Sequence, residues 1–173
     1  MKRIRYGVAM SLDGFIAGPS GEADWIVMDP DVNFGEIWAQ FDTLLMGRRT
    51  YQAAVARLGE SSMQGHTVVI VSRTLKPADH PNVTILSDLN RSQMQRLRAG
   101  PGKKDIWLMG GGLLFRALLK MHQVDTVEVS IMPVLLGAGI PLLPPPAPTA
   151  KLKLTSHKTY RSGLVSLVYE VQN

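Results

Sequence analysis

The sequence has no cysteine among its 173 residues, which excludes disulfide bonds, cysteine-bound zinc and thiol nucleophiles. The four histidines, His66, His80, His122 and His157, lack the spacing of metal ligands, so we expect no metal site. The Gly-x-Ser-x-Gly motif is missing, and the stretch GPGKK has neither the spacing nor the hydroxyl of a P-loop. The chain therefore shows no nucleophile of its own and no NTPase signature.

Long apolar runs are absent as well. Asp13 ends the apolar stretch that follows the basic N-terminus, so neither a signal peptide nor a membrane span can be built there. We therefore expect a cytoplasmic protein without membrane contact.

The surplus of basic residues is modest. Lys and Arg number 19 against 14 Asp and Glu, and only 6% of the residues are aromatic. Because no basic stripe is interleaved with aromatic residues, we expect no nucleic-acid partner. The alternative is a weak nucleic-acid surface formed by Arg98, Lys103 and Lys104, which would show a steep salt dependence.

Apolar periodicity predicts an α/β fold in a single domain, residues 1–173. The runs at 43–47, 67–72 and 106–111 are short and nearly continuous, which is typical of strands that helices cover on both faces of a parallel sheet. After Val124 the residues alternate between apolar and polar, and this pattern predicts antiparallel strands. We expect a mixed sheet, parallel in the middle and antiparallel towards the C-terminus.

Three helices are predicted between these runs. The first is capped by Asp29, and its apolar residues recur at helical spacing up to position 41. The second follows a cap at Ser87 or Asp88, and the third begins at Gly112. The proline-rich segment 137–150 is interpreted as a stiff connecting loop, with a ligand for another domain as the alternative.

Two arginines follow Gly47, at the end of the first apolar run. If Gly47 ends a strand, Arg48 and Arg49 lie at the carboxyl edge of the sheet, where open α/β folds bind ligands. The free amides of the next helix would face the same point, and guanidinium groups bind phosphate in bidentate fashion. The pattern indicates a phosphate site; the alternative is that both arginines point into water.

Two further strand ends carry similar groups. Ser72 and Arg73 offer a hydroxyl and a guanidinium after the second run, although an ordinary turn would explain them too. The glycines 110–112 let the backbone approach a ligand, or they simply form a tight turn. Their spacing is not that of the Rossmann fingerprint. Together the three strand ends predict a bound anionic cofactor.

A carboxylate is the remaining candidate. On the wheel of the first predicted helix, Asp31 lies close to Trp38 and Phe34 and so shares the inward stripe. An acid on an apolar face near a cleft can bind a cationic or amide-bearing heterocycle. The alternative is that Asp31 only complements the helix dipole.

The segments VAMSLDGFIA, GEADWI, DTLLMGRRTY, VVIVSRT, IWLMGGGLLFRALL and VDTVEVSIMPVLLGAGIPLL, in this order, resemble the dihydrofolate reductase superfamily. They look closest to the reductase domain of riboflavin-biosynthesis deaminase–reductases, here as a stand-alone member. SLDGFIA and PVLLGAGIPLL are the most specific pieces. The resemblance implies a three-layer α/β/α sandwich around a mixed, mostly parallel sheet. It also implies NADPH as hydride donor and a pterin- or pyrimidine-like substrate.

The resemblance implies which residues hold NADPH. The adenosine phosphates and the 2′-phosphate would meet residues after two strand ends: Gly47, Arg48, Arg49, Thr50, Ser72 and Arg73. The pyrophosphate would be lined by the residues around the glycine triplet: Met109, Gly110, Gly111, Gly112, Leu113 and Leu114. The nicotinamide would lie near Ala9 and Ile16.

Trp25 and Asp31 are the implied substrate residues. Trp25 would lie on a loop over the site, and Asp31 matches the carboxylate that binds the pterin in dihydrofolate reductase. Asp31 is therefore our candidate catalytic residue, anchoring the substrate and assisting protonation. The riboflavin-pathway reductases have a DDP segment after the threonine that matches Thr50, and this chain has YQAAVARLG instead. Ribosylaminopyrimidine itself is therefore not the expected substrate.

These observations lead to one function and one alternative. We expect an NADPH-dependent reductase that transfers a hydride to a C=N or C=O bond of a small heterocycle. The alternative is a non-catalytic NADP(H)-binding or assembly protein that retains the fold and binds NADPH without oxidising it. Family similarity favours a homodimer, in which the late strands and the proline-rich loop would bury apolar surface.

Overall fold

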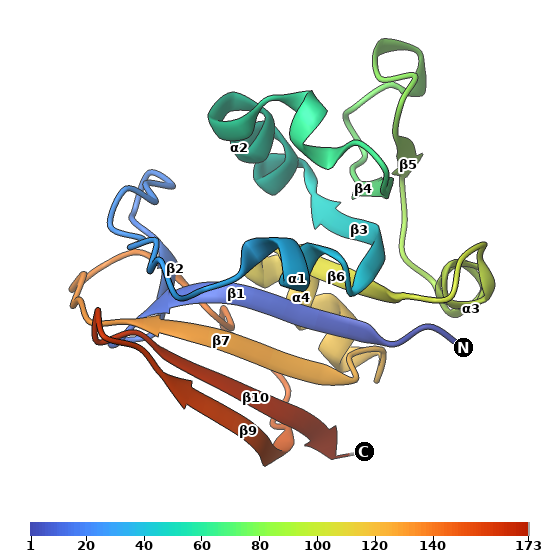
Figure 1. Ribbon diagram of the computed structural model, residues 1–173. Coiled ribbons are helices and arrows are strands. Elements are labelled where there is room, and N and C mark those ends of the chain that lie inside the picture. Colours follow the sequence, from blue (N-terminus) through green and yellow to red (C-terminus); the bar gives the residue numbers. More distant parts are fainter. Residues whose placement is uncertain (173) are drawn as a thin grey trace.

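The three apolar runs are neighbouring strands of one eight-stranded sheet (Figure 1) in the computed structural model of the chain, which describes residues 1–172. The strand order is β5-β4-β3-β6-β1-β7-β10-β9. The six strands from β5 to β7 are parallel, and β10 and β9 are antiparallel to their neighbours. The bounds are β1 Ile4–Ser11, β3 Phe41–Gly47, β4 Thr67–Val71, β5 Thr84–Leu86, β6 Asp105–Gly110, β7 Thr126–Met132, β9 Lys151–Thr159 and β10 Val165–Gln172. The predicted mixed, mostly parallel sheet is confirmed.

Helices cover both faces of this sheet and give three layers (Figure 1). They are α1 Phe34–Trp38, α2 Arg48–Leu58, α3 Arg91–Ala99 and α4 Gly112–Lys120, with the 3₁₀ helices η1 Glu60–Met63 and η2 Pro77–Asp79. Met94 of α3 and Phe115 of α4 belong to the apolar cluster on one face, whereas Trp38 of α1 and Tyr51 of α2 belong to the cluster on the other. We call these the α4 face and the α1 face. Within residues 1–172, no helix is both long and apolar enough to cross a membrane.

The first helix is shorter than its sequence pattern predicts. It is capped by Asn33, whose side chain accepts a hydrogen bond from the amide of Glu36, so the prediction of Asp29 as the cap is wrong. Asp29 is buried instead and accepts hydrogen bonds from the amides of Asp31 and Ser162. The carboxylate therefore ties the loop before α1 to the turn between β9 and β10.

The second helix also has a different cap from the expected one. Asn90, not Ser87 or Asp88, precedes α3, and its side chain and that of Gln93 exchange hydrogen bonds with each other's backbone amides. This reciprocal pair is a capping box, which satisfies two amides that the helix leaves free. Residues 87–89, which follow β5, therefore do not cap α3.

The proline-rich segment is more than a connection. Within it, Ile140–Pro141 forms β8, which pairs with β2, Phe15–Ala17, in a second sheet of two strands. Two parts of the chain more than 120 residues apart are thereby joined at the carboxyl end of β1. Beyond the segment, β9 forms the last strand of the main sheet, and every one of its nine residues is exposed.

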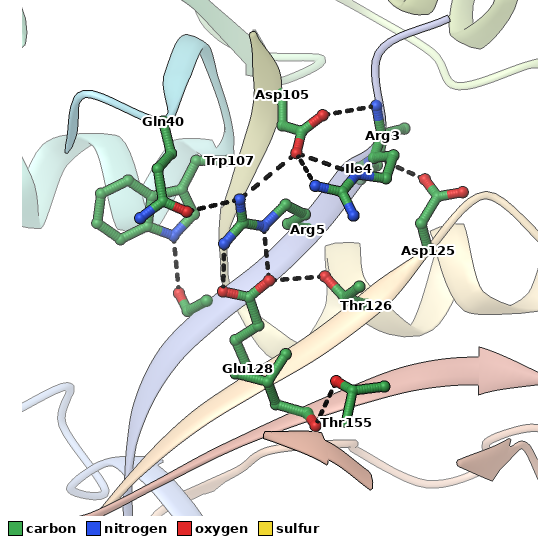
Figure 2. A network of polar contacts seen from close by, with 12 residues as sticks. Arg3, Ile4, Arg5, Gln40, Asp105, Trp107, Asp125, Thr126, Glu128 and Thr155 are labelled. Carbon is green, nitrogen blue, oxygen red and sulfur yellow. Dashed lines mark hydrogen bonds and ion pairs between the residues drawn. The ribbon is translucent and has the colours of Figure 1, made fainter. Parts of the chain in front are cut away.

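A network of charged side chains links the central strands on the α1 face (Figure 2). Arg5 of β1 donates to both carboxylate oxygens of Glu128 on β7, at 2.6 and 2.8 Å, and to Asp105 on β6 at 3.4 Å. Its guanidinium also lies 4.7 Å from the ring centre of Phe41. Burial opposes the charged form, but the bonds and charge of Glu128, followed by those of Asp105, outweigh it and raise the pKa of Arg5. Side chains therefore join β6, β1 and β7 in addition to the backbone.

Candidate cofactor site

Helices α2 and α4 begin side by side at the carboxyl edge of the sheet. They follow the neighbouring strands β3 and β6, in which Met46 is paired with Gly110, and they lead away on opposite faces. Open α/β sheets bind ligands at such a switch point. The caps of the two helices are Gly47 and Gly111, and neither has a side chain to bond the first amides. Both helix N-termini therefore offer free backbone donors to an anion.

Neither cap position is closed to a side chain by its φ angle or by the atoms of more distant residues. Gly47 and Gly111 have extended backbone, with φ of −80° and −78°, which any residue can adopt. A Cβ atom on Gly47 would lie 3.8 Å from the carbonyl oxygen of Gly110, and one on Gly111 would lie 3.5 Å from the hydroxyl of Thr50. Both are ordinary contacts. Glycine at these two positions fits a ligand that approaches the backbone more closely than a side chain would allow.

The other two glycines of the triplet serve the fold itself. Gly110 has φ of +106°, a conformation that side chains rarely adopt. A Cβ atom on Gly112 would lie 2.8 Å from the carbonyl oxygen of Pro141 and 2.8 Å from the ring of Pro144. The three glycines therefore have different roles. Gly111 leaves room for a ligand, whereas the backbone conformation requires glycine at 110 and close packing requires it at 112.

The predicted arginines have no side-chain partner within residues 1–172. Arg48, Arg49 and Arg73 are exposed, and no residue in the described part of the chain forms a hydrogen bond or an ion pair with their guanidinium groups. Arg98 is different, because it pairs with Asp125 and donates hydrogen bonds to the backbone carbonyls of Lys2 and Gln123, which precede β1 and β7. The guanidinium groups of Arg48, Arg49 and Arg73 thus lie unpaired at the carboxyl ends of β3 and β4.

A pocket of about 440 Å³ opens beside Gly47. Its polar wall is formed by Ser72 and Arg73 after β4 and by Ser87 and Asp88 after β5. Its apolar wall consists of residues from β4, from the start of the α3 loop and from α4: Val71, Leu89, Leu113, Leu114, Ala117 and Met121. The pocket lies on the α4 face and is large enough for a nucleoside.

Only part of this pocket was predictable from the sequence. Gly47, Ser72, Arg73 and the first leucines of α4 were predicted to bind the cofactor, and they do line the pocket. Ser87 and Asp88 were predicted to cap a helix instead, although both follow a short β-branched run that ends a strand. Arg48, Arg49 and Thr50 lie at the adjoining start of α2 and are not in the lining.

The residues predicted for the nicotinamide lie on the next strand. Tyr6 and Val8 of β1 pack into the cluster of the α4 face, so the alternating Ala9 points to the α1 face. Ile16 belongs to β2, which contacts β1. A ligand that extends from the pocket past Gly47 to Ala9 would therefore cross the carboxyl ends of β3 and β6, from the α4 face to the α1 face.

Asp13 connects the two most specific segments of the sequence. Its carboxylate accepts hydrogen bonds from the Ser11 hydroxyl at 2.6 Å and from the amides of Leu136 and Gly137 at 3.1 and 2.7 Å. The bond from the Ser11 hydroxyl, and then those from the two amides, lower the pKa of Asp13. SLDGFIA and PVLLGAGIPLL are thus held together next to Ile16. Both segments stand out in the sequence, but no local pattern in it indicates that they touch.

The two predicted substrate residues lie on the loop between β2 and α1. Trp25 is partly buried, its indole donates to the carbonyl of Glu22 at 3.0 Å, and Arg57 of α2 holds the same loop through the carbonyl of Ala23. Asp31 is exposed and precedes α1, so the prediction that it shares the inward stripe of a helix is wrong. The resemblance alone now supports its role.

Comparisons with known proteins agree with this architecture. The RibD C-terminal domain family matches residues 2–166. The chain is 34% identical over 179 residues to the protein YyaP of Bacillus subtilis (strain 168), covering 97% of this chain and 94% of that protein. It is 27% identical over 155 residues to the riboflavin biosynthesis protein RibD of Mycobacterium tuberculosis, covering 81% of this chain but 44% of that longer protein.

Solved structures share the fold along its whole length. A crystal structure of a protein assigned to riboflavin biosynthesis, from Shewanella sp. PV-4, has a TM-score of 0.84 at 23% identity and covers 100% of both chains. The deaminase/5-amino-6-(5-phosphoribosylamino)uracil reductase of Thermotoga maritima has a TM-score of 0.73 at 17% identity, covering 99% of this chain and 57% of that one. At these identities the similarity shows the fold alone.

The class of protein follows from the sheet order and the paired helix starts: an α/β protein with the fold of RibD reductase domains. The chain belongs to the RibD C-terminal domain family. The resemblance drawn from the sequence is thereby confirmed. The family and its riboflavin-biosynthesis relatives support a reductase-like role.

Proposed function

We propose that the protein is an NADPH-dependent reductase that transfers a hydride to a C=N or C=O bond of a small pterin- or pyrimidine-like heterocycle. One observation carries the cofactor part of this proposal. Gly47 and Gly111 cap two adjoining helices, and neither position is closed to a side chain by its φ angle or by the atoms of more distant residues. A pyrophosphate group bound to the free amides would require that space. When bound, NADPH would supply the hydride.

The residues of the chain would bind the cofactor and the heterocycle and orient them toward each other. The amides at the starts of α2 and α4 would hold the pyrophosphate, and Arg48 and Arg49 would neutralise its charge. The pocket with Ser72 and Arg73 would take the adenosine and its 2′-phosphate. The nicotinamide would lie near Ala9, with the heterocycle on the α1 face of β1. Holding two reactants in this order contributes much of the catalysis of such a reaction.

Replacing Arg48 and Arg49 together by alanine is expected to weaken NADPH binding by about 10- to 100-fold. A hydrogen bond to a charged group contributes about 1.5–3 kcal/mol, and neither guanidinium has a partner in the described chain whose loss would disturb the fold. Titration of tryptophan fluorescence with NADPH measures the affinity, and thermal unfolding measures stability.

The matched control removes the same charge from another helix. Arg91 and Arg96 are exposed on α3, so the double alanine variant there should bind NADPH as the unmodified protein does. An equal loss of affinity in both double variants would mean that net charge, not the start of α2, governs binding. No loss in either would remove the assigned role of Arg48 and Arg49.

A non-catalytic NADP(H)-binding role is the second candidate, and one observation favours it. Helix α1 carries no carboxylate on its inward side, because Asp31 precedes the helix and Glu36 is exposed. Oxidation of NADPH in the presence of a panel of heterocycles and quinones separates the two functions. Oxidation that the Arg48/Arg49 double variant loses supports the reductase, whereas binding without oxidation supports the alternative.

Asp31→Asn tests the carboxylate role that the resemblance implies. If Asp31 anchors or helps to protonate the substrate, kcat is expected to fall about 100-fold. NADPH affinity and stability should not change, since the Asp31 side chain is exposed and forms no hydrogen bond in the described structure. Asp24→Asn, on the same loop and also exposed, is the control. An unchanged kcat in Asp31→Asn would eliminate this residue as the catalytic group.

A further inference from the structure

The pocket beside Gly47 holds two opposite charges that do not form an ion pair. Arg73 follows β4 and Asp88 follows β5, and they are the only ionisable residues in its lining. Both are exposed, and no ion pair in residues 1–172 joins them. The lining is therefore neutral overall, although it adjoins the positively charged start of α2.

Hydrogen bonds of Ser72 fix the position of the turn that carries Arg73. The amide of Ser72 donates to the carbonyl of Leu86 at 2.9 Å, so β4 and β5 end together. The buried Ser72 hydroxyl accepts hydrogen bonds from the amides of Thr74 and Leu75 at 3.2 and 3.1 Å. These bonds close the turn that carries Arg73, so Ser72 is occupied with the turn and Arg73 is the group left for a phosphate.

Asp88 is held with one carboxylate oxygen available. Its Oδ1 accepts from the amide of Leu89 at 2.8 Å, and no described residue donates to Oδ2. A carboxylate beside an adenosine site can accept a hydrogen bond from a ribose 2′-hydroxyl, as in the Rossmann fold. The same carboxylate repels a 2′-phosphate. Arg73 has the opposite preference, because its guanidinium binds phosphate.

We propose that Asp88 determines coenzyme selectivity by opposing Arg73, so that the pocket accepts adenine nucleotides with either a 2′-hydroxyl or a 2′-phosphate. This inference rests on the proposed function and refines it. The preference for NADPH over NADH is smaller than Arg73 alone would give, and one acidic residue controls it.

Isothermal titration calorimetry with adenosine 2′,5′-bisphosphate and with 5′-AMP tests the inference, since the two probes differ only in the 2′-phosphate. Asp88→Asn is expected to bind the bisphosphate about fivefold more tightly while its affinity for 5′-AMP does not rise. Arg73→Ala is expected to bind the bisphosphate about tenfold more weakly with 5′-AMP unaffected. Asp79→Asn removes an exposed carboxylate outside the lining and should change neither affinity.

Each remaining outcome is decisive. Equal changes for both nucleotides in Asp88→Asn, or the same gain in Asp79→Asn, would overturn the role of Asp88 and leave the proposed function standing. If the unmodified protein binds neither nucleotide, the proposed function fails and this inference fails with it. Thermal unfolding of every variant confirms that a lost affinity is not a lost fold.

Discussion

Gly47→Ala is expected to leave the protein folded and to weaken NADPH binding by about tenfold or more. The backbone at Gly47 is extended, and the added methyl group would meet its nearest neighbour at 3.8 Å, so stability should change little. The same methyl group would occupy the point where the N-termini of α2 and α4 converge. Crowding of this kind costs about 1–3 kcal/mol, which reduces affinity by about 5- to 150-fold.

Fluorescence titration with NADPH, together with thermal unfolding, measures both halves of this prediction. Gly112→Ala is the matched control, because a Cβ atom there would lie 2.8 Å from a backbone carbonyl and should destabilise the fold. Unchanged affinity in a folded Gly47→Ala protein would show that no ligand needs the space beside Gly47, and the cofactor proposal would lose its support.

Arg5→Met is expected to lower the free energy of unfolding by about 3 kcal/mol. The Arg5 and Glu128 side chains are only 14% and 19% exposed, and their two hydrogen bonds are 2.6 and 2.8 Å long. Removing one partner of a largely buried pair leaves the other charge without compensation, which destabilises far more than the loss of a surface pair. Glu128 would keep only the Thr126 hydroxyl.

Urea unfolding measures this effect, and Arg3→Met provides the comparison. Arg3 pairs with the same Asp105, but its side chain is 59% exposed, so its loss should cost less than about 1 kcal/mol. Equal losses in the two variants would show that burial does not distinguish them. An unaffected Arg5→Met protein would show that the network across β6, β1 and β7 contributes nothing to stability.

The strand ends were predictable because they depend on local patterns. A continuous apolar run that ends in Gly47 or Ser72 identifies both a buried strand and its carboxyl edge, and parallel strands bring those edges together. The sheet class, the start of α4 and the position of Arg73 in the pocket all followed from this reasoning.

Features that depend on tertiary contacts were not predictable. Helix α1 begins about one turn later than predicted, because the buried Asp29 accepts a hydrogen bond from the turn between β9 and β10. No residue near Asp29 in the sequence indicates this partner. The sequence also offers no way to divide the glycine triplet, because Gly112 is required by Pro141 and Pro144, which lie about thirty residues further on. Asp88 was mistaken for a cap because Asn90, two residues later, suits that position equally well.

The pairing of β2 with β8 limits how the protein can be re-engineered. A long proline-rich connection would ordinarily accommodate inserted peptides, tags or new chain ends. Here Asp13 fixes its first part, and a Cβ atom on Gly139 would clash with the carbonyl of Ala17. Circular permutants should therefore be opened elsewhere, for instance in the exposed stretch 76–79, where the backbone contacts no distant strand.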